Sequence, residues 1–131
     1  PRFLSGTAKM RCKLFLEPKS MPLLEWRTGG YPYKIGPSIR MEADGQLVAN
    51  GKPLVRLPAR QWIDIEIVCP LGKKARGTYD LTVTLANQPA QSFAKLPCDP
   101  AFKNLGWLGF ISLPSVRTAF FVDDLYVELP P

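Results

Sequence analysis

The sequence predicts an all-β fold, and two features of its 131 residues support that prediction. Apolar and polar residues alternate along several short runs, the pattern of a strand with one face buried and one face wet. Fourteen prolines and ten glycines are scattered between these runs, which favours many short strands and leaves little room for helices. We therefore expect an antiparallel β-sandwich.

The first half of the sequence predicts five strands, over residues 9–16, 23–27, 39–42, 46–49 and 52–57. Pro18 and Pro22 bracket the first turn, and Gly29-Gly30 ends the second strand. Asn50-Gly51 is the strongest hairpin signal in the chain, because both central positions of that turn type need a positive φ, which Asn and Gly tolerate.

The second half predicts five more strands, over residues 62–69, 78–86, 91–95, 107–113 and 118–129. Isoleucine occupies every second position from Ile63 to Ile67, and the two runs at 62–69 and 78–86 form an antiparallel pair. The segment 97–106 has room for at most one helical turn. Ten short strands with frequent turns are typical of a sandwich or barrel.

Composition excludes several classes of function. The chain has no histidine, so Ser-His-Asp catalysis, Cys-His catalysis and a histidine-ligated zinc site are excluded. No run approaches the roughly 20 apolar residues of a membrane-spanning helix, and we expect no membrane partner. The net charge is +6, but the basic residues are spread along the chain, so nucleic acid is not an expected partner. The sequence begins at Pro1, and we expect one domain, residues 1–131, excised from a larger protein.

The three cysteines do not form an even disulfide set. Cys12 shares a predicted strand face with Met10 and Leu14, so we expect a buried free thiol. An up-down-up order of strands would bring Cys69 and Cys98 to the same end of a sheet. A disulfide between them and a pair of free thiols are both compatible with that order, and a disulfide would favour an exported protein.

Two pairs of neighbouring carboxylates are candidate functional sites. Asp64 and Glu66 lie on one strand face about 7 Å apart, a separation that an inverting glycosidase would accept. No second feature marks a catalytic cleft, and we expect no enzyme activity. Asp123 and Asp124 are candidate ligands for a structural calcium ion. The alternative is that one aspartate caps a loop amide and the other is solvated.

Aromatic residues beside charged ones suggest carbohydrate binding. Sugar rings stack on Trp and Tyr, and their hydroxyls pair with charged side chains. One candidate site combines Glu25 and Arg27 with Tyr31 and Tyr33, whose loop has no burial pattern that would explain the two tyrosines. A second lies on the strand face of Trp62, Asp64 and Glu66, and a third surrounds Trp107, Phe102 and Asn104. The competing expectations are that Trp26 lies in the core and that the run from Trp107 to Ile111 is a strand buried on both faces.

The order of motifs resembles the laminin G-like branch of the concanavalin A-like lectin/glucanase superfamily. The matching features are the Gly-Tyr-x-Tyr loop, the Asp44-Gly45 turn, the Trp62-led strand, its partner 79–83 and the ending 120–127. The resemblance implies a jelly roll of two antiparallel sheets, with sugar sites on a sheet face or on edge loops. It also implies attachment to secreted carbohydrate-active enzymes. The catalytic carboxylate strand of the glucanase members is missing here.

We therefore expect a non-catalytic module that binds a polysaccharide or oligosaccharide, secreted or periplasmic, beside a catalytic domain of the same chain. The expected ligand contacts are Glu25, Arg27, Tyr31, Tyr33, Asp64 and Glu66. One alternative is a structural or protein-interaction domain that binds no sugar, with Trp62 as an interface anchor. A third hypothesis is polyanion binding through Lys73, Lys74, Arg76 and Arg60.

Overall fold

The computed structural model describes residues 5–114 and 116–128, and over these residues the chain forms ten strands. Their bounds are β1 (Gly6–Leu16), β2 (Pro22–Arg27), β3 (Ile35–Met41), β4 (Gln46–Ala49), β5 (Lys52–Arg56), β6 (Trp62–Leu71), β7 (Thr78–Thr84), β8 (Gln91–Pro97), β9 (Trp107–Ser112) and β10 (Phe120–Glu128). Each of the ten predicted strands is confirmed, with ends that move by up to four residues.

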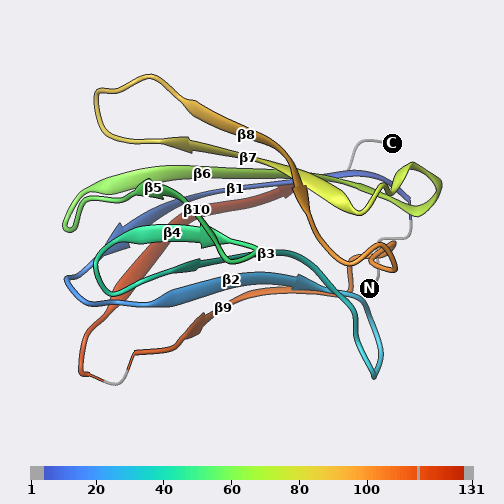
Figure 1. The fold of residues 1–131 in the computed structure, drawn as a ribbon, viewed down its shortest axis with the longest axis horizontal. Helices are drawn as coiled ribbons and strands as arrows, with labels where there is room; N and C mark the ends of the chain where they lie inside the picture. The colour runs from blue at the N-terminus through green and yellow to red at the C-terminus, as the bar shows by residue number, and fades with distance from the viewer. Residues whose placement is uncertain (1–4, 115, 129–131) are drawn as a thin grey trace.

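The strands form two five-stranded antiparallel sheets that lie one over the other (Figure 1). One sheet has the order β10-β1-β6-β7-β8 and the other has the order β5-β4-β3-β2-β9. We call them the β6 sheet and the β2 sheet. The fold class predicted from the sequence is therefore confirmed as a β-sandwich. None of the described residues forms a helix long and apolar enough to span a bilayer.

Alternating side chains fill the space between the sheets. Ile63, Ile65 and Ile67 are at most 1% exposed, as their period predicted, and β6 pairs with β7 in antiparallel register. Trp26 is fully buried in the same core, which confirms the prediction that it is not a binding platform. Cys12 is a buried free thiol, again as predicted.

Turn chemistry fixes the ends of the strands. Asn50 and Gly51 have φ values of 51° and 74°, so the turn between β4 and β5 has the two positive φ values that its sequence predicted. The loop between β6 and β7 contains one short 3₁₀ turn, Gly72–Lys74. The segment 97–106, which had room for a helical turn, contains no helix.

One strand differs from its prediction. The run from Trp107 to Ile111 was expected to be buried on both faces, yet no residue of β9 is buried and Trp107 is 40% exposed. The prediction was wrong because β9 is an edge strand that pairs only with β2 among the described strands. An uninterrupted apolar run indicates a central strand only when both of its edges are covered.

Candidate functional site

The β2 sheet carries a charged pair on its outer face. Leu24 and Trp26 point into the core, so the alternate residues Glu25 and Arg27 point outward. Arg27 Nε donates a hydrogen bond of 2.7 Å to Glu25 Oε2, and Ser38 Oγ of the neighbouring strand donates one of 3.0 Å to Oε1. Glu25 is only 5% exposed. A buried carboxylate with both oxygens engaged holds its arginine in one position.

Two aromatic rings enclose the Arg27 guanidinium. Its Cζ lies 4.4 Å from the centroid of the Tyr33 ring and 4.3 Å from that of Trp107. Both distances are within the range of a cation–π contact. Tyr33 is 38% exposed and Trp107 is 40% exposed, so both rings also face solvent. We call Glu25, Arg27, Tyr33 and Trp107 the ring site.

Glycines make room for this arrangement. Trp107 is the cross-strand partner of Arg27, and Gly109 is that of Glu25. A Cβ atom on Gly109 would lie 2.5 Å from the Trp107 ring, so the indole lies against bare backbone. A Cβ on Gly106 would lie 2.3 Å from the Cα of Gly29. The loop that follows β2 and the loop that precedes β9 therefore touch through their backbones.

The loop 28–34 brings Tyr33 back to the sheet. Thr28 N donates to the carbonyl oxygen of Lys34 at 3.0 Å, and Lys34 N donates to Thr28 Oγ1 at 2.8 Å. Asn104 Oδ1 accepts a hydrogen bond from Gly29 N at 3.0 Å, which ties the loop to the segment before β9. Tyr31 is 91% exposed near the loop tip, and its bond to Pro32 is cis. The structure thus groups Glu25, Arg27 and Tyr33 as predicted, leaves the predicted Tyr31 outside the group, and adds Trp107 from the third predicted site.

A hollow of about 360 Å³ adjoins the ring site on the same sheet. Ser38, which bonds Glu25, is one of its walls, and Arg40 of the same strand is another. Its remaining lining residues are Leu23, Ile35, Gly36, Val48, Asn50, Gly51, Pro97, Cys98 and Asp99. From β9 to β4 the surface crosses three strand spacings, about 14 Å. This extent suits an extended ligand better than a single small group.

Asp64 and Glu66 lie on the outer face of the other sheet, away from the ring site. Lys13 Nζ is 3.9 Å from Asp64 Oδ1, and Arg11 Nε is 4.0 Å from Glu66 Oε2. They line a shallow hollow of about 320 Å³. These ion pairs are long and largely exposed, so they fix their side chains weakly. The structure places the six predicted contact residues on two opposite faces.

The sequence predicted Trp62 beside Asp64, but it gave no signal for the aromatic row to which Trp62 belongs. Trp62, Phe15 and Phe121 are cross-strand partners on β6, β1 and β10. The Trp62 and Phe15 ring centroids are 5.2 Å apart, and those of Phe15 and Phe121 are 6.0 Å apart. Trp62 and Phe121 are 44% and 51% exposed. Only the register of three strands brings the row together, and a single sequence does not show that register.

Asp123 and Asp124 form a bulge in β10. Asp124 has a φ of 51°, and its N–H donates to Asp123 Oδ1 at 2.8 Å. This contact matches the alternative in which one aspartate caps a nearby amide. Within residues 5–114 and 116–128, no three acidic, cysteine or histidine side chains gather as metal ligands.

Cys69 and Cys98 lie at the same end of the sandwich, as the strand order predicted, and both are free thiols. A hydrogen bond between them raises the pKa of Cys69 and lowers the pKa of Cys98. Burial raises the pKa of Tyr79, next to them in the core, to about 12. Cys98 also borders the hollow beside the ring site.

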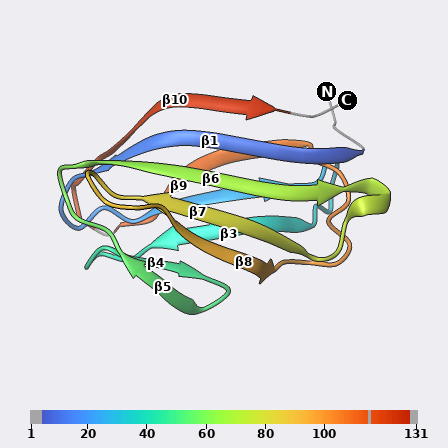
Figure 2. The same ribbon diagram turned by 90° about the horizontal axis from the view of Figure 1, so that it is seen from above.

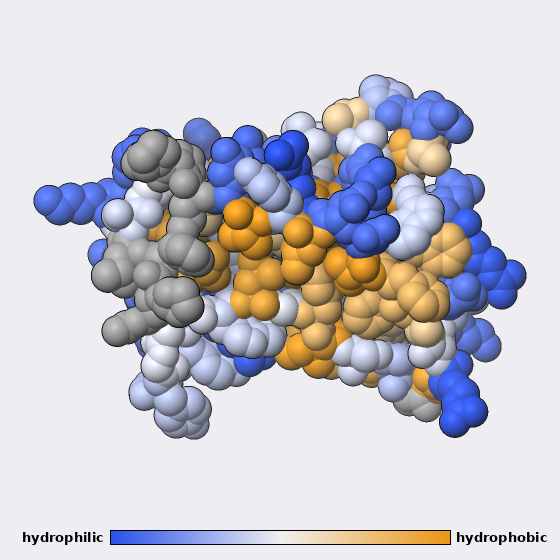
Figure 3. Space-filling view, turned by 180° about the vertical axis from the view of Figure 1, so that it is seen from behind, coloured by the Kyte–Doolittle hydropathy of each residue, from blue (hydrophilic) through white to orange (hydrophobic). Residues whose placement is uncertain are grey.

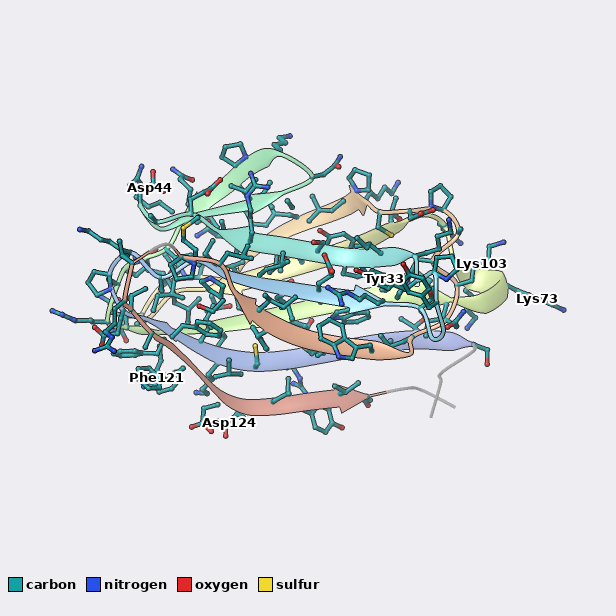
Figure 4. The ribbon with its side chains drawn as sticks, turned by 90° about the horizontal axis from the view of Figure 1, so that it is seen from below. Tyr33, Asp44, Lys73, Lys103, Phe121 and Asp124 are labelled. Atoms are coloured by element: carbon teal, nitrogen blue, oxygen red, sulfur yellow. The ribbon has the colours of Figure 1, made fainter. Side chains whose placement is uncertain are left out.

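The residues proposed for polyanion binding do not form one patch. Lys73, Lys74 and Arg76 lie in the loop after β6, whereas Arg60 precedes β6 and binds Glu17 Oε2 at 3.1 Å. The ten residues of β6 separate them by about 33 Å. Figure 4 shows Lys73 and Lys103 at one end of the molecule and Phe121 at the other. A single compact anion site cannot therefore include Arg60 together with the other three residues.

Comparison with known proteins yields only a likeness of fold. No family model matches the chain, and no curated protein matches it. The crystal structure of a functionally unknown protein from Saccharomyces cerevisiae superposes with a TM-score of 0.51 at 10% sequence identity. The superposition covers 100% of this chain and 73% of the yeast chain.

Proposed function

We propose that this domain binds a carbohydrate, without catalysing its turnover, through the ring site and the hollow beside it. The observation that carries the proposal is the position of Arg27, between two half-exposed rings and fixed by a buried carboxylate. Rings offer a face for sugar C–H groups, and a guanidinium donates to neighbouring hydroxyls. Arg27 uses only Nε within the described residues, so its terminal N–H groups remain to bind a ligand.

Local charge favours a neutral glycan over an acidic one. Arg27 is neutralised by Glu25, and Arg40 binds Glu42 Oε1 at 3.1 Å. The surface therefore offers hydrogen-bonding groups without a large net charge, despite the +6 of the whole chain. Binding through it is expected to change little with salt, whereas polyanion binding weakens log-linearly with salt.

Affinity electrophoresis against neutral and acidic polysaccharides, at two salt concentrations, tests the proposal. Retention on a neutral glycan is expected, and it should be lost in Trp107→Ala and in Tyr33→Ala. Trp62→Ala is the matched control, because Trp62 is similarly exposed but lies on the other sheet. Retention that survives both ring-site substitutions, or that only acidic gels show, would contradict the proposal.

A second candidate function is that of a structural or protein-interaction domain without sugar binding. The aromatic row of Trp62, Phe15 and Phe121 favours it, because exposed aromatic residues are common anchors of protein interfaces. The two functions predict different results for Trp62→Ala and for the wild-type protein. If the second is correct, Trp62→Ala weakens association with a neighbouring domain, and no glycan gel retains the wild-type protein.

The finer assignments belong to the same proposal. We infer that the domain is a jelly roll of the concanavalin A-like, laminin G-like kind. We infer that it is secreted or periplasmic and attached to a carbohydrate-active enzyme, and that it binds a structural calcium ion near Asp123 or Asp124. The adjacency of β1 and β10 in one sheet supports the fold assignment. An experimental structure superposed on such domains, with strands paired in the same order, tests it. Addition of a chelator should lower the melting temperature if calcium is bound.

A further inference from the structure

Positive charge gathers at the end of the sandwich where β6 ends and β7 begins. Six ion pairs form among the described residues. The basic residues at this end take part in none of the six, and they are Lys73, Lys74, Arg76, Lys95 and Lys103. This end therefore carries a large share of the excess positive charge of the chain, which is +6 in total.

Three of these basic residues line one hollow on the outer face of the β6 sheet. The hollow has a volume of about 660 Å³ and adjoins the loop between β6 and β7. Figure 2 looks onto this face, with that loop at its right-hand end. Lys74, Arg76 and Lys95 line the hollow, and Thr7 and Thr78 add hydroxyl groups. The side of the sandwich bordered by β9 and β10 differs, because apolar residues gather across it (Figure 3).

A β-bulge brings Lys95 to this face. Ala94 and Lys95 of β8 both oppose the single residue Asp80 of β7, because the register shifts between Tyr79 and Leu81. Strict alternation would turn one of the two toward the core, but both are exposed. Lys95 has a φ of 55°, and its N–H donates to Asp80 Oδ1 at 2.9 Å, which holds the bulge in place. Bulges of this kind re-aim a side chain and are frequent beside functional sites.

The loop between β6 and β7, which carries the other two basic residues of the hollow, is fixed at both ends. Gly72 N donates to the carbonyl oxygen of Lys103 at 2.7 Å. The carbonyl oxygen of Gly77 accepts a hydrogen bond from Cys98 N at 2.9 Å. Because the backbone beneath the three basic side chains is held in place, a ligand has to order only the side chains themselves.

We propose that this hollow binds an acidic polysaccharide, with its sulfate or carboxylate groups against Lys74, Arg76 and Lys95. A guanidinium pairs with two oxygens of such a group, and an ammonium acts on it as a point charge. Thr7 and Thr78 donate hydrogen bonds to the sugar oxygens. A volume of about 660 Å³ suits a short stretch of a chain better than a single small ion.

Nucleic acid fits the hollow less well. Tyr79 is the aromatic residue among its described lining residues, and Tyr79 is only 2% exposed. The hollow therefore offers no ring on which a base could stack. One carboxylate, that of Asp80, also lines the hollow, and its charge is outweighed by the three basic side chains. The inference is independent of the carbohydrate proposal for the ring site, since the two sites lie on different sheets.

The test measures binding of the protein to immobilised heparin, which carries sulfate groups, and to polygalacturonate, which carries carboxylates. A mixed-sequence DNA, single-stranded and as a duplex, is the nucleic-acid comparison. Binding to at least one of the two polysaccharides is expected, and the one that binds identifies the anionic group. Three contacts between basic side chains and anionic groups should weaken binding about 20- to 40-fold between 50 and 200 mM salt.

Charge variants locate the binding. Lys95→Gln should weaken binding at 50 mM salt about five-fold and lower the slope of log affinity against log salt by about one third. Lys52→Gln is the matched control, because it removes the same charge from exposed Lys52 of β5, on the other sheet. Asp80→Asn keeps an acceptor for the N–H of Lys95 and removes the negative charge, so it should tighten binding about three-fold. Trp107→Ala, which alters the ring site, should bind like the wild type.

Four results would each overturn the inference. The first is that neither polysaccharide binds in a salt-dependent way. The second is that DNA binds more tightly than both polysaccharides. The third is an equal loss of affinity in Lys95→Gln and Lys52→Gln, which would show that only the net charge matters. The fourth is a loss of binding in Trp107→Ala, which would place the polysaccharide at the ring site.

Discussion

The buried ion pair of the ring site gives the sharpest prediction. Glu25→Gln keeps the shape of the side chain and removes its charge. The carboxylate accepts from Arg27 at 2.7 Å and from Ser38 at 3.0 Å while only 5% exposed. A hydrogen bond to a charged group contributes about 1.5 to 3 kcal/mol, and a buried pair that loses one partner is destabilised more. Because Arg27 remains partly solvated and stacked on two rings, we expect a loss of about 2 kcal/mol.

The chain contains its own control for this substitution. Arg40 and Glu42 form a second pair at the same sequence spacing, 3.1 Å long, but their side chains are 47% and 35% exposed. Glu42→Gln should therefore change stability by less than about 0.5 kcal/mol. Urea denaturation measures both, and the midpoint of Glu25→Gln should fall by about 1 M. Equal, small effects of the two substitutions would refute the claim that Glu25 anchors the site.

Three further predictions concern the core and the other sheet. Gly36→Ala should cost about 1 to 3 kcal/mol in urea denaturation, since the new Cβ would lie 2.6 Å from the buried Phe102 ring. Burial raises the pKa of Cys12 to about 12, so above pH 9 the unfolded state loses a proton that the native state keeps, and stability should fall with rising pH. Cys12→Ala should reduce the slope of the unfolding free energy against pH by up to about 1.4 kcal/mol per pH unit. Denaturation curves at pH 8 to 11 measure this slope, and an unchanged slope would contradict the prediction. A double-mutant cycle of Phe15→Leu and Trp62→Leu should give a coupling free energy of about 0.5 to 1.5 kcal/mol. Zero coupling would show that the contact between these two rings of the aromatic row does not stabilise the fold.

The strands could be predicted because each rests on local chemistry. The alternation in β6 and the Asn50-Gly51 turn need no knowledge of the rest of the chain, and both were found as predicted. Strand β9 was mistaken because burial depends on neighbours, and its apolar sequence does not reveal that it lies at an edge. Local pattern therefore defines strands well and their place in a sheet poorly.

The candidate site shows the same division. The sequence suggested Arg27 and Tyr33 through their spacing, because a strand residue and a nearby loop residue meet easily. Trp107 joins them from 80 positions further along the chain, through the pairing of β2 with β9. The row of Phe15, Trp62 and Phe121 spans a still longer separation. A single sequence does not show which distant strands pair or in which register.

Strands β2 and β6 both carry charged side chains at alternate positions, but the two sets of side chains are held in place to different extents. Glu25 and Arg27 are two residues apart, as are Asp64 and Glu66. Only the first pair is enclosed, because Trp107 and the Tyr33 loop cover it. A side chain that is already fixed loses little conformational entropy when a ligand binds, whereas the exposed partners of Asp64 must first be ordered. Recognition should therefore be stronger at the ring site. The same reasoning requires that Glu25→Gln, which frees Arg27, weaken glycan retention more than Asp64→Asn on the same affinity gels.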